Sequence, residues 1–182
     1  ASSRDANDRE LFMTGVVDLA MEVEFLSILQ HPHIIKMRGI SVLPPCSDSS
    51  FILMDRLYET LAEKLQNWKK DYSKLNILKS KRSRRHFFAR RMCIAQDIAS
   101  ALNYLHSNGI IHRDLKPANM GFDARGDIKL FDFGLAREMT NEDLSDNGYY
   151  HLTKETGSLR YMSPEVGRGL PYNHKTDVYS YS

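Results

Sequence analysis

The sequence predicts a mixed α+β fold, in which short strands precede and interrupt a mainly helical remainder. Apolar residues recur at helical spacing in residues 14–30 and again, more regularly, in residues 95–105. Four short apolar segments have the length of strands instead, and two of them flank a tight turn. The 182 residues are 42% hydrophobic, which is enough for one sizeable core.

The first predicted element is a helix over residues 14–30. Leu19, Leu26 and Leu29 form its apolar stripe, and Pro32 ends it because proline disfavours helical geometry in the residue before it. Glu22 lies on the same stripe, where a carboxylate is costly unless a cation or hydrogen-bond donors meet it. The alternative is a carboxylate at the edge of the stripe that reaches water.

Residues 34–41 and 51–54 are predicted strands, separated by turn-forming residues at 43–50. Residues 120–122 and 128–131 are predicted to pair as a hairpin around the turn at 123–127.

Two further helices are predicted between these strands. Thr60 and Glu63 have the spacing of a capping box, so a helix begins there. A second helix ends at the cap formed by Asn108 and Gly109. The basic run at 79–91 is interpreted as a solvated loop and an exposed first helical turn, with a nuclear-import or nucleic-acid patch as the alternative. The apolar stripe of the second helix comprises Ala95, Ile98, Ala99, Leu102 and Leu105.

The charge, the apolar runs and the cysteine spacing exclude several classes of function for this chain. A formal net charge of +2 is too balanced to indicate nucleic-acid binding, and no apolar run approaches the roughly 18 residues of a membrane span. Cys46 and Cys93 have no metal-ligand or redox spacing and are predicted to be reduced thiols. We therefore expect a cytoplasmic protein, with the nucleus not excluded.

Polar side chains concentrate between the helix cap and the hairpin. Asp114, Lys116 and Asn119 lie in this loop, and Asp132 follows at the end of the second hairpin strand. Carboxylate and amide oxygens converge there if the hairpin folds back. Two such ligands together with phosphate oxygens suit Mg²⁺, which keeps waters and needs few protein ligands.

These residues resemble the H-R-D-L-x-x-x-N and D-F-G motifs of eukaryotic protein kinases, here 112–119 and 132–134. The resemblance extends over nearly the whole chain. Glu22 matches the helix-C glutamate, and 51–57 resembles the last N-lobe strand and the hinge. Residues 163–165 resemble the A-P-E motif with Ser in place of Ala, and 177–182 resembles the start of the central C-lobe helix. The resemblance implies a two-lobed fold, with residues 1–57 an incomplete N-lobe and 58–182 an incomplete C-lobe.

The resemblance also implies the roles of residues around ATP and Mg²⁺. Asp114 would orient or accept the proton of the substrate hydroxyl, and Lys116 would neutralise the transferring phosphoryl group. Asn119 and Asp132 would bind Mg²⁺. Backbone groups of Asp55 and Leu57 would bind adenine behind a Met54 gatekeeper. Gly121 replaces the apolar residue usual below the base, which implies less apolar contact there.

The Asp-Leu-Lys-Pro stretch around Lys116 is similar to serine/threonine kinases, so the expected substrate is a protein hydroxyl. No glycine-rich loop or lysine precedes Glu22, the first lysine being Lys36. We expect that N-terminal strands are missing and that the chain alone has little activity. The alternatives are a pseudokinase that acts as a binding or scaffold module, and a small-molecule phosphotransferase.

Residues 137–160 are predicted to be a long functional loop. Ser158 occupies the position of a family threonine that contacts the catalytic Asp and Lys. By the resemblance, Arg113 would pair with a phosphate on this loop, and we hypothesise that Thr153 or Thr156 carries it. The resemblance also implies that Asp177 holds the catalytic-loop backbone.

Overall fold

The computed structural model describes residues 3–41, 50–78, 80–153 and 156–182. The predicted turn-rich loop before residue 50 and Cys46 lie outside these ranges, whereas Cys93 is a free, exposed thiol. The elements are α1 (Ser3–Ile28), β1 (Met37–Ile40), β2 (Ile52–Met54), β3 (Glu59–Thr60), α2 (Leu61–Leu78), α3 (Lys81–Ser107), β4 (Ile110–Ile111), the 3-10 turn η1 (Pro117–Asn119), β5 (Met120–Phe122), β6 (Ile128–Leu130), β7 (Arg137–Glu138), α4 (Pro164–Gly167) and α5 (Lys175–Tyr181).

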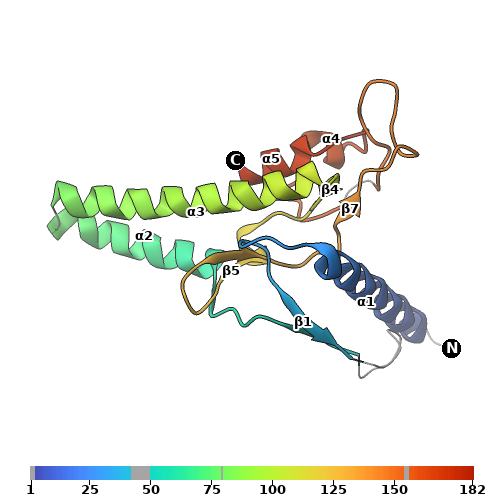
Figure 1. Cartoon of the computed structure of the whole chain (residues 1–182), viewed down its shortest axis with the longest axis horizontal. Helices are drawn as coiled ribbons and strands as arrows, with labels where there is room; N and C mark the ends of the chain where they lie inside the picture. Colours follow the sequence, from blue (N-terminus) through green and yellow to red (C-terminus); the bar gives the residue numbers. More distant parts are fainter. Residues whose placement is uncertain (1–2, 42–49, 79, 154–155) are drawn as a thin grey trace.

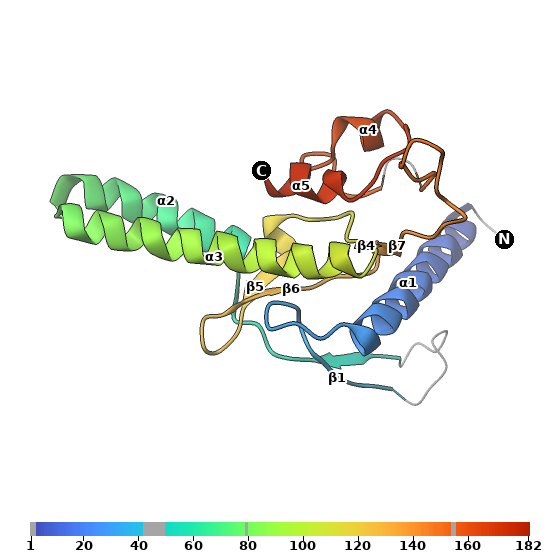
Figure 2. The same cartoon turned by 45° about the horizontal axis from the view of Figure 1, so that its top comes forward.

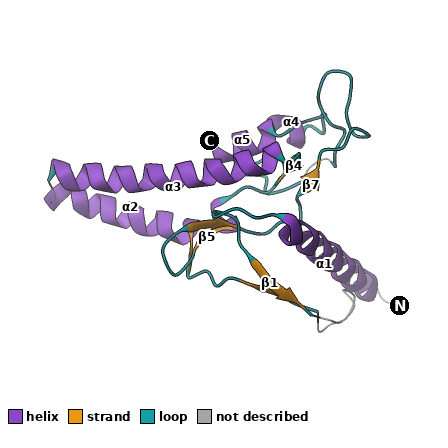
Figure 3. Cartoon of the chain, in the orientation of Figure 1, coloured by secondary structure: helices purple, strands orange, loops and turns teal. Residues whose placement is uncertain are grey.

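The predicted mixed α+β class is confirmed, and Figure 3 shows long helices and short strands connected by loops. Helices α2 and α3 lie side by side and project away from the remainder of the chain (Figure 1, Figure 2). Helix α1 and the β1–β2 sheet lie on one side of the strands β5 and β6, and α4 and α5 lie on the other. The loops between β4 and β7 therefore lie between α1 with the β1–β2 sheet on one side and α4 with α5 on the other.

Three small antiparallel sheets organise the centre. The predicted hairpin is confirmed as β5 and β6, with Met120 opposite Leu130, and β3 adds to it with Thr60 opposite Gly121. The segment predicted as one strand over 34–41 is divided between two partners. Its first part pairs with β6, where Ile35 N–H donates to the Leu130 carbonyl at 2.9 Å, and only β1 pairs with β2.

Helix boundaries differ from the prediction in two places. Helix α1 spans Ser3–Ile28 and not 14–30. The basic run is helical from Lys81 onward, so the loop predicted there is wrong. Lysine and arginine are good helix formers, and Ser80 caps the helix by accepting from the Ser83 amide at 3.4 Å. The capping box is confirmed, since Glu63 N–H donates to Thr60 Oγ1 at 3.2 Å and Thr60 N–H to Glu63 Oε2 at 2.7 Å.

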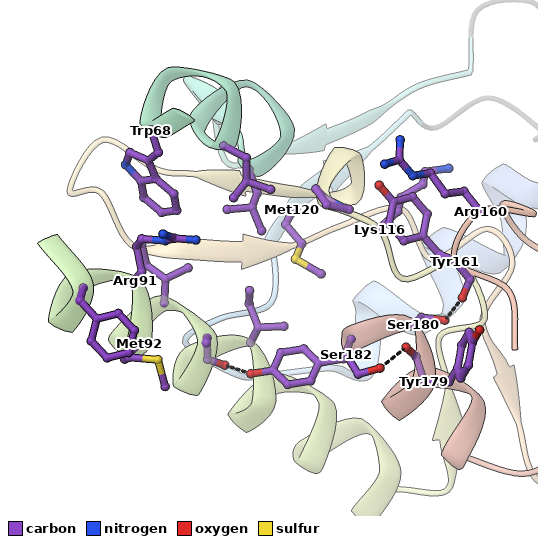
Figure 4. Close-up of a pocket in the computed structure, with 18 residues that line it drawn as sticks. Trp68, Arg91, Met92, Lys116, Met120, Arg160, Tyr161, Tyr179, Ser180 and Ser182 are labelled. Carbon is purple, nitrogen blue, oxygen red and sulfur yellow. Dashed lines mark hydrogen bonds between the residues drawn. The ribbon is translucent and has the colours of Figure 1, made fainter. Parts of the chain in front are cut away.

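The main core lies where α1 and α3 meet β5 and β6. A groove of about 860 Å³ lies between α2, α3 and α5, with Trp68 and Arg91 at one end and Lys116 and Arg160 at the other (Figure 4). Within the described residues, no helix has the length and apolar character needed to cross a bilayer.

Candidate active site

Asp177 holds the loop that leads from β4 to η1. Its carboxylate is fully buried and accepts hydrogen bonds from the backbone amides of His112 at 2.9 Å and Arg113 at 3.0 Å. The Nε2 atom of His106 lies 2.9 Å from the same carboxylate. The contact expected of Asp177 is therefore present, and it joins α5 to the loop and to the end of α3.

His112 links this loop to residues 131–133. The Asp114 amide donates to Nδ1 of His112 at 3.3 Å, and Nε2 lies 3.4 Å from the Phe131 carbonyl oxygen. Nδ1 therefore accepts, and the single ring proton lies on Nε2. Burial lowers the pKa of His112 despite the nearby carboxylates, which keeps the ring neutral. The ring packs 5.0 Å from the ring of Phe133, centroid to centroid.

Asp114 is the centre of a buried hydrogen-bond network. Lys116 Nζ lies 2.5 Å from Oδ2, and Asn119 Nδ2 donates to the same oxygen at 3.0 Å. The Ser158 amide donates to Oδ1 at 2.8 Å. Burial would raise the pKa of Asp114, but hydrogen bonds from Lys116 and Ser158 outweigh burial and hold the pKa below its usual value. Asp114 is thus an anionic acceptor at neutral pH.

Ser158 reaches this network because Gly157 lets two segments touch. Gly157 has φ +99°, and a Cβ at this position would lie 2.3 Å from the carbonyl oxygen of Arg113. A side chain would push the segment away from the loop. The Ser158 hydroxyl accepts from Lys116 Nζ at 3.0 Å, so the contact expected of Ser158 is present. The sequence analysis did not single out Gly157. The only signal for it was that a glycine directly precedes Ser158.

Asn119 and Asp132 are brought together by the backbone. The Phe131 amide donates to the Asn119 carbonyl at 3.0 Å, which places Asp132 beside the end of η1. Asp132 has φ +67°, an uncommon conformation that redirects the chain there. The amide nitrogen of Asn119 donates to Asp114, so its amide oxygen is the atom left for a cation.

The donor set at this position fits a magnesium ion. An amide oxygen from Asn119 and a carboxylate from Asp132 are hard oxygen ligands, and Mg²⁺ takes few of them from protein. In the described ranges, no three His, Cys, Asp or Glu side chains are grouped to hold a metal. The donors therefore fit an ion that shares its coordination with phosphate and water.

Glu22 of α1 faces the turn after β6. Its Oε1 accepts from the Phe133 amide at 3.4 Å, so a hydrogen-bond donor meets this carboxylate. Burial raises the pKa of Glu22, and the negative charge of Asp132 raises it further. Helix α1 packs closely here, because a Cβ on Gly134 would lie 3.0 Å from Cβ of Asp18.

The residues expected to bind adenine follow β2. Met54 is 37% exposed, and the Asp55 carboxylate pairs with Arg38 at 2.5 Å and 3.1 Å. Leu57 covers Gly121, because a Cβ built on Gly121 would lie 2.8 Å from Leu57 Cδ1. The structure therefore brings Leu57 next to the strand that follows Asn119.

The expected phosphate-binding residue, Arg113, has φ +67° and donates from Nε to the Leu135 carbonyl at 2.6 Å. Its Nη1 lies 3.4 Å from the Tyr172 hydroxyl, which donates to the Thr153 carbonyl at 2.8 Å. The Thr156 hydroxyl donates to the same carbonyl at 3.2 Å. Arg113 is thus linked through Tyr172 to the segment that carries both threonines. The sequence reasoning missed Tyr172, whose role depends on contacts far apart in the chain.

Comparison with known proteins gives a consistent result. The protein kinase domain family model matches residues 4–182. The chain is 31% identical over 167 residues to serine/threonine-protein kinase STY17 of Arabidopsis thaliana, covering 91% of this chain and 25% of that protein. It is 36% identical over 157 residues to NUAK family SNF1-like kinase 2 of Rattus norvegicus, covering 86% and 21% respectively.

The chain thus spans a quarter or less of the length of these curated relatives. Among solved structures, a chain of the yeast RNA Pol II CTD kinase CTDK-1 complex is similar, with a TM-score of 0.67 and 23% identity. The match covers 91% of this chain and 47% of that one, and it shows a shared fold.

Proposed function

Because the chain belongs to the protein kinase family, we propose that the protein containing it transfers the γ-phosphoryl group of MgATP to a serine or threonine hydroxyl of a protein. The observation that carries the proposal is the single network of Asp114, Lys116, Asn119 and Ser158, with Asp132 beside it. Residues 1–57 would belong to the N-lobe and hinge, and residues 58–182 to the C-lobe.

In this proposal Asp114 orients the substrate hydroxyl and accepts its proton. Its lowered pKa keeps the carboxylate ionised, and three donors fix its position. Lys116 lies between Asp114 and Ser158, where its charge would stabilise the negative charge of the transferring phosphoryl oxygens. Such fixed groups need little reorganisation during the reaction.

Asn119 and Asp132 would hold Mg²⁺, which when bound neutralises charge on the phosphates. Adenine would meet backbone groups of Asp55 and Leu57 behind Met54. The Leu57 side chain, which covers Gly121, would supply the apolar contact that residue 121 cannot. Glu22 would pair with a phosphate-anchoring lysine.

The serine/threonine assignment is supported by Lys116 and by the similarity to serine/threonine-protein kinase STY17. The test is phosphorylation of a peptide array by the full-length protein with ATP and Mg²⁺, with Asp132→Asn as the control. Labelling of serine or threonine peptides that disappears in the variant would support the proposal. Labelling confined to tyrosine peptides, or equal labelling by the variant, would overturn it. Partner binding with no labelling at all would favour the pseudokinase alternative.

A further inference from the structure

The projecting end of the α2–α3 pair carries a concentrated positive charge. Residues 81–91 hold six of the chain's 25 basic residues and none of its 23 acidic ones, so the rest of the chain has four more acidic than basic residues. Asp97 is the only acidic residue in α3. The net charge near zero is therefore the sum of a strongly basic segment in α3 and an acidic remainder of the chain.

These charges are presented on a folded helix and lie outside the site described above. None of the ion pairs found among the described residues involves residues 81–91. The end of the helix projects beyond the strands and beyond α4 and α5 (Figure 1, Figure 2). It is anchored to α2, because Trp68 packs edge-on against Phe87 at 6.0 Å and Arg91 lies over the Trp68 ring at 5.5 Å.

One stripe of α3 combines two cations with two large apolar side chains. Lys81, Arg85, Phe88 and Met92 follow one another at steps of four, three and four residues, so they lie along one line of the helix. All four are exposed in this 182-residue chain, Phe88 by 62% and Met92 by 52%, and these two also line the groove between α2, α3 and α5. We call these four residues the α3 stripe.

We propose that the α3 stripe is a docking surface for an acidic protein segment that carries carboxylates at one end and apolar side chains at the other. Glutamates or aspartates would pair with Lys81 and Arg85, and the apolar residues would cover Phe88 and Met92. Charge complementarity determines which half of the segment meets which half of the stripe. A nucleic-acid backbone would match the cations but offers no aliphatic side chains for Phe88 and Met92, and the charged half of the stripe lacks the continuous apolar face of a membrane-surface helix.

The experiment measures fluorescence anisotropy of a labelled peptide, a run of glutamates followed by leucines, with the full-length protein. Lys81→Glu with Arg85→Glu should weaken binding about tenfold or more, since two attractions become repulsions. Arg168→Glu with Lys175→Glu reverses two exposed cations elsewhere and should leave affinity unchanged. Raising the salt from about 0.05 M to about 0.5 M should weaken the wild-type complex.

A second pair of variants tests the apolar half. Phe88→Ala with Met92→Ala should weaken binding of the glutamate–leucine peptide several-fold but leave binding of an all-glutamate peptide unchanged. Circular dichroism checks that each variant is folded. Absence of peptide binding overturns the proposal. So does equally tight binding of duplex DNA or phosphatidylserine vesicles together with no effect of the alanine pair, because the surface would then recognise polyanions in general.

Discussion

Leu57 lies so close to Gly121 that a side chain at residue 121 would require Leu57 to move. A Cβ there would be 2.8 Å from Leu57 Cδ1 and 3.2 Å from Leu57 Cβ. We predict that Gly121→Val lowers the free energy of unfolding by about 1–3 kcal/mol, because overpacking forces side chains or backbone to move. Urea denaturation followed by circular dichroism measures this change.

The same contact predicts coupling between the two positions. In the Gly121→Val background, Leu57→Ala should cost less than it does alone, because it removes Leu57 Cδ1, the atom closest to the added Cβ. Gly39→Val is the matched control in β1, where an added Cβ would meet Leu53 only at 3.9 Å. Strictly additive effects of the Leu57 and Gly121 changes would contradict the packing described.

Asp177 provides a second test, because its buried carboxylate serves two backbone amides. Asp177→Asn keeps the shape but replaces one acceptor oxygen with an NH₂ group, which leaves the His112 or Arg113 amide without its acceptor. A buried unpaired donor costs about 1–3 kcal/mol, and we expect a loss of that size in urea denaturation. Asp146→Asn, at an exposed aspartate, should have almost no effect. Equal effects of the two substitutions would refute the role of Asp177.

Much of this site could be predicted because its residues are close together in the sequence. The Thr60–Glu63 capping box and the 120–130 hairpin are local patterns, and the structure contains both. The cluster at 112–119 was also visible, since a folded hairpin brings Asp132 back to it. Local signals therefore located the loop and the strands that hold it.

Other features depend on contacts that no local pattern reveals. Residues 3–10 of α1 are polar or charged except for Ala6, so no apolar stripe marked the start of this helix. The high charge of the basic run favoured its interpretation as a solvated loop, although lysine and arginine are good helix formers and the run is helical from Lys81. The close approach of Gly157 to Arg113, and the link from Tyr172 to Thr153, join residues more than 15 positions apart. Such contacts follow from the fold as a whole.

His31 predicts a dependence of stability on pH. Its Nδ1 accepts from the His33 amide at 3.1 Å, its Nε2 lies 3.2 Å from Ser100 Oγ, and its ring stacks on Tyr104. Burial lowers the pKa of His31, and the nearby charges of His33 and Lys129 lower it further. The neutral form is therefore favoured by folding, so this stabilisation is present above the ordinary pKa of 6.5 and is lost as pH falls through the lowered value.

His31→Gln should therefore show a smaller loss of unfolding free energy than the wild type as pH falls from about 7 to about 5. His112 and His174 also have lowered pKa values and contribute to both proteins equally, so the difference between the two pH profiles isolates His31. Urea denaturation at several pH values provides the measurement. Parallel profiles for wild type and variant would show that His31 does not contribute.

The two threonines near Arg113 test the proposed regulation in the full-length protein. Thr153→Ala with Thr156→Ala should lower peptide phosphorylation about tenfold or more, because a phosphate there would add charge-assisted hydrogen bonds that order the segment. Phosphopeptide mass spectrometry of the active protein identifies which threonine carries the group. Ser145→Ala, in the same loop, is the control. Unchanged turnover in the double variant would remove both residues from the regulatory proposal.

Ser158 gives the sharpest test of the proposed reaction centre. Its hydroxyl accepts from Lys116 at 3.0 Å, while its amide donates to Asp114 at 2.8 Å. Ser158→Ala removes the first bond and keeps the second, so Lys116 loses one of the two partners that fix its position. Loss of one such bond is worth about 1–1.5 kcal/mol, which predicts a kcat about tenfold lower in the full-length protein. Ser158→Thr keeps the hydroxyl and should stay near the wild-type rate, and Ser107→Ala, at an exposed serine of α3, should match it. A wild-type kcat in Ser158→Ala at saturating ATP and peptide would show that Lys116 needs no support from this segment.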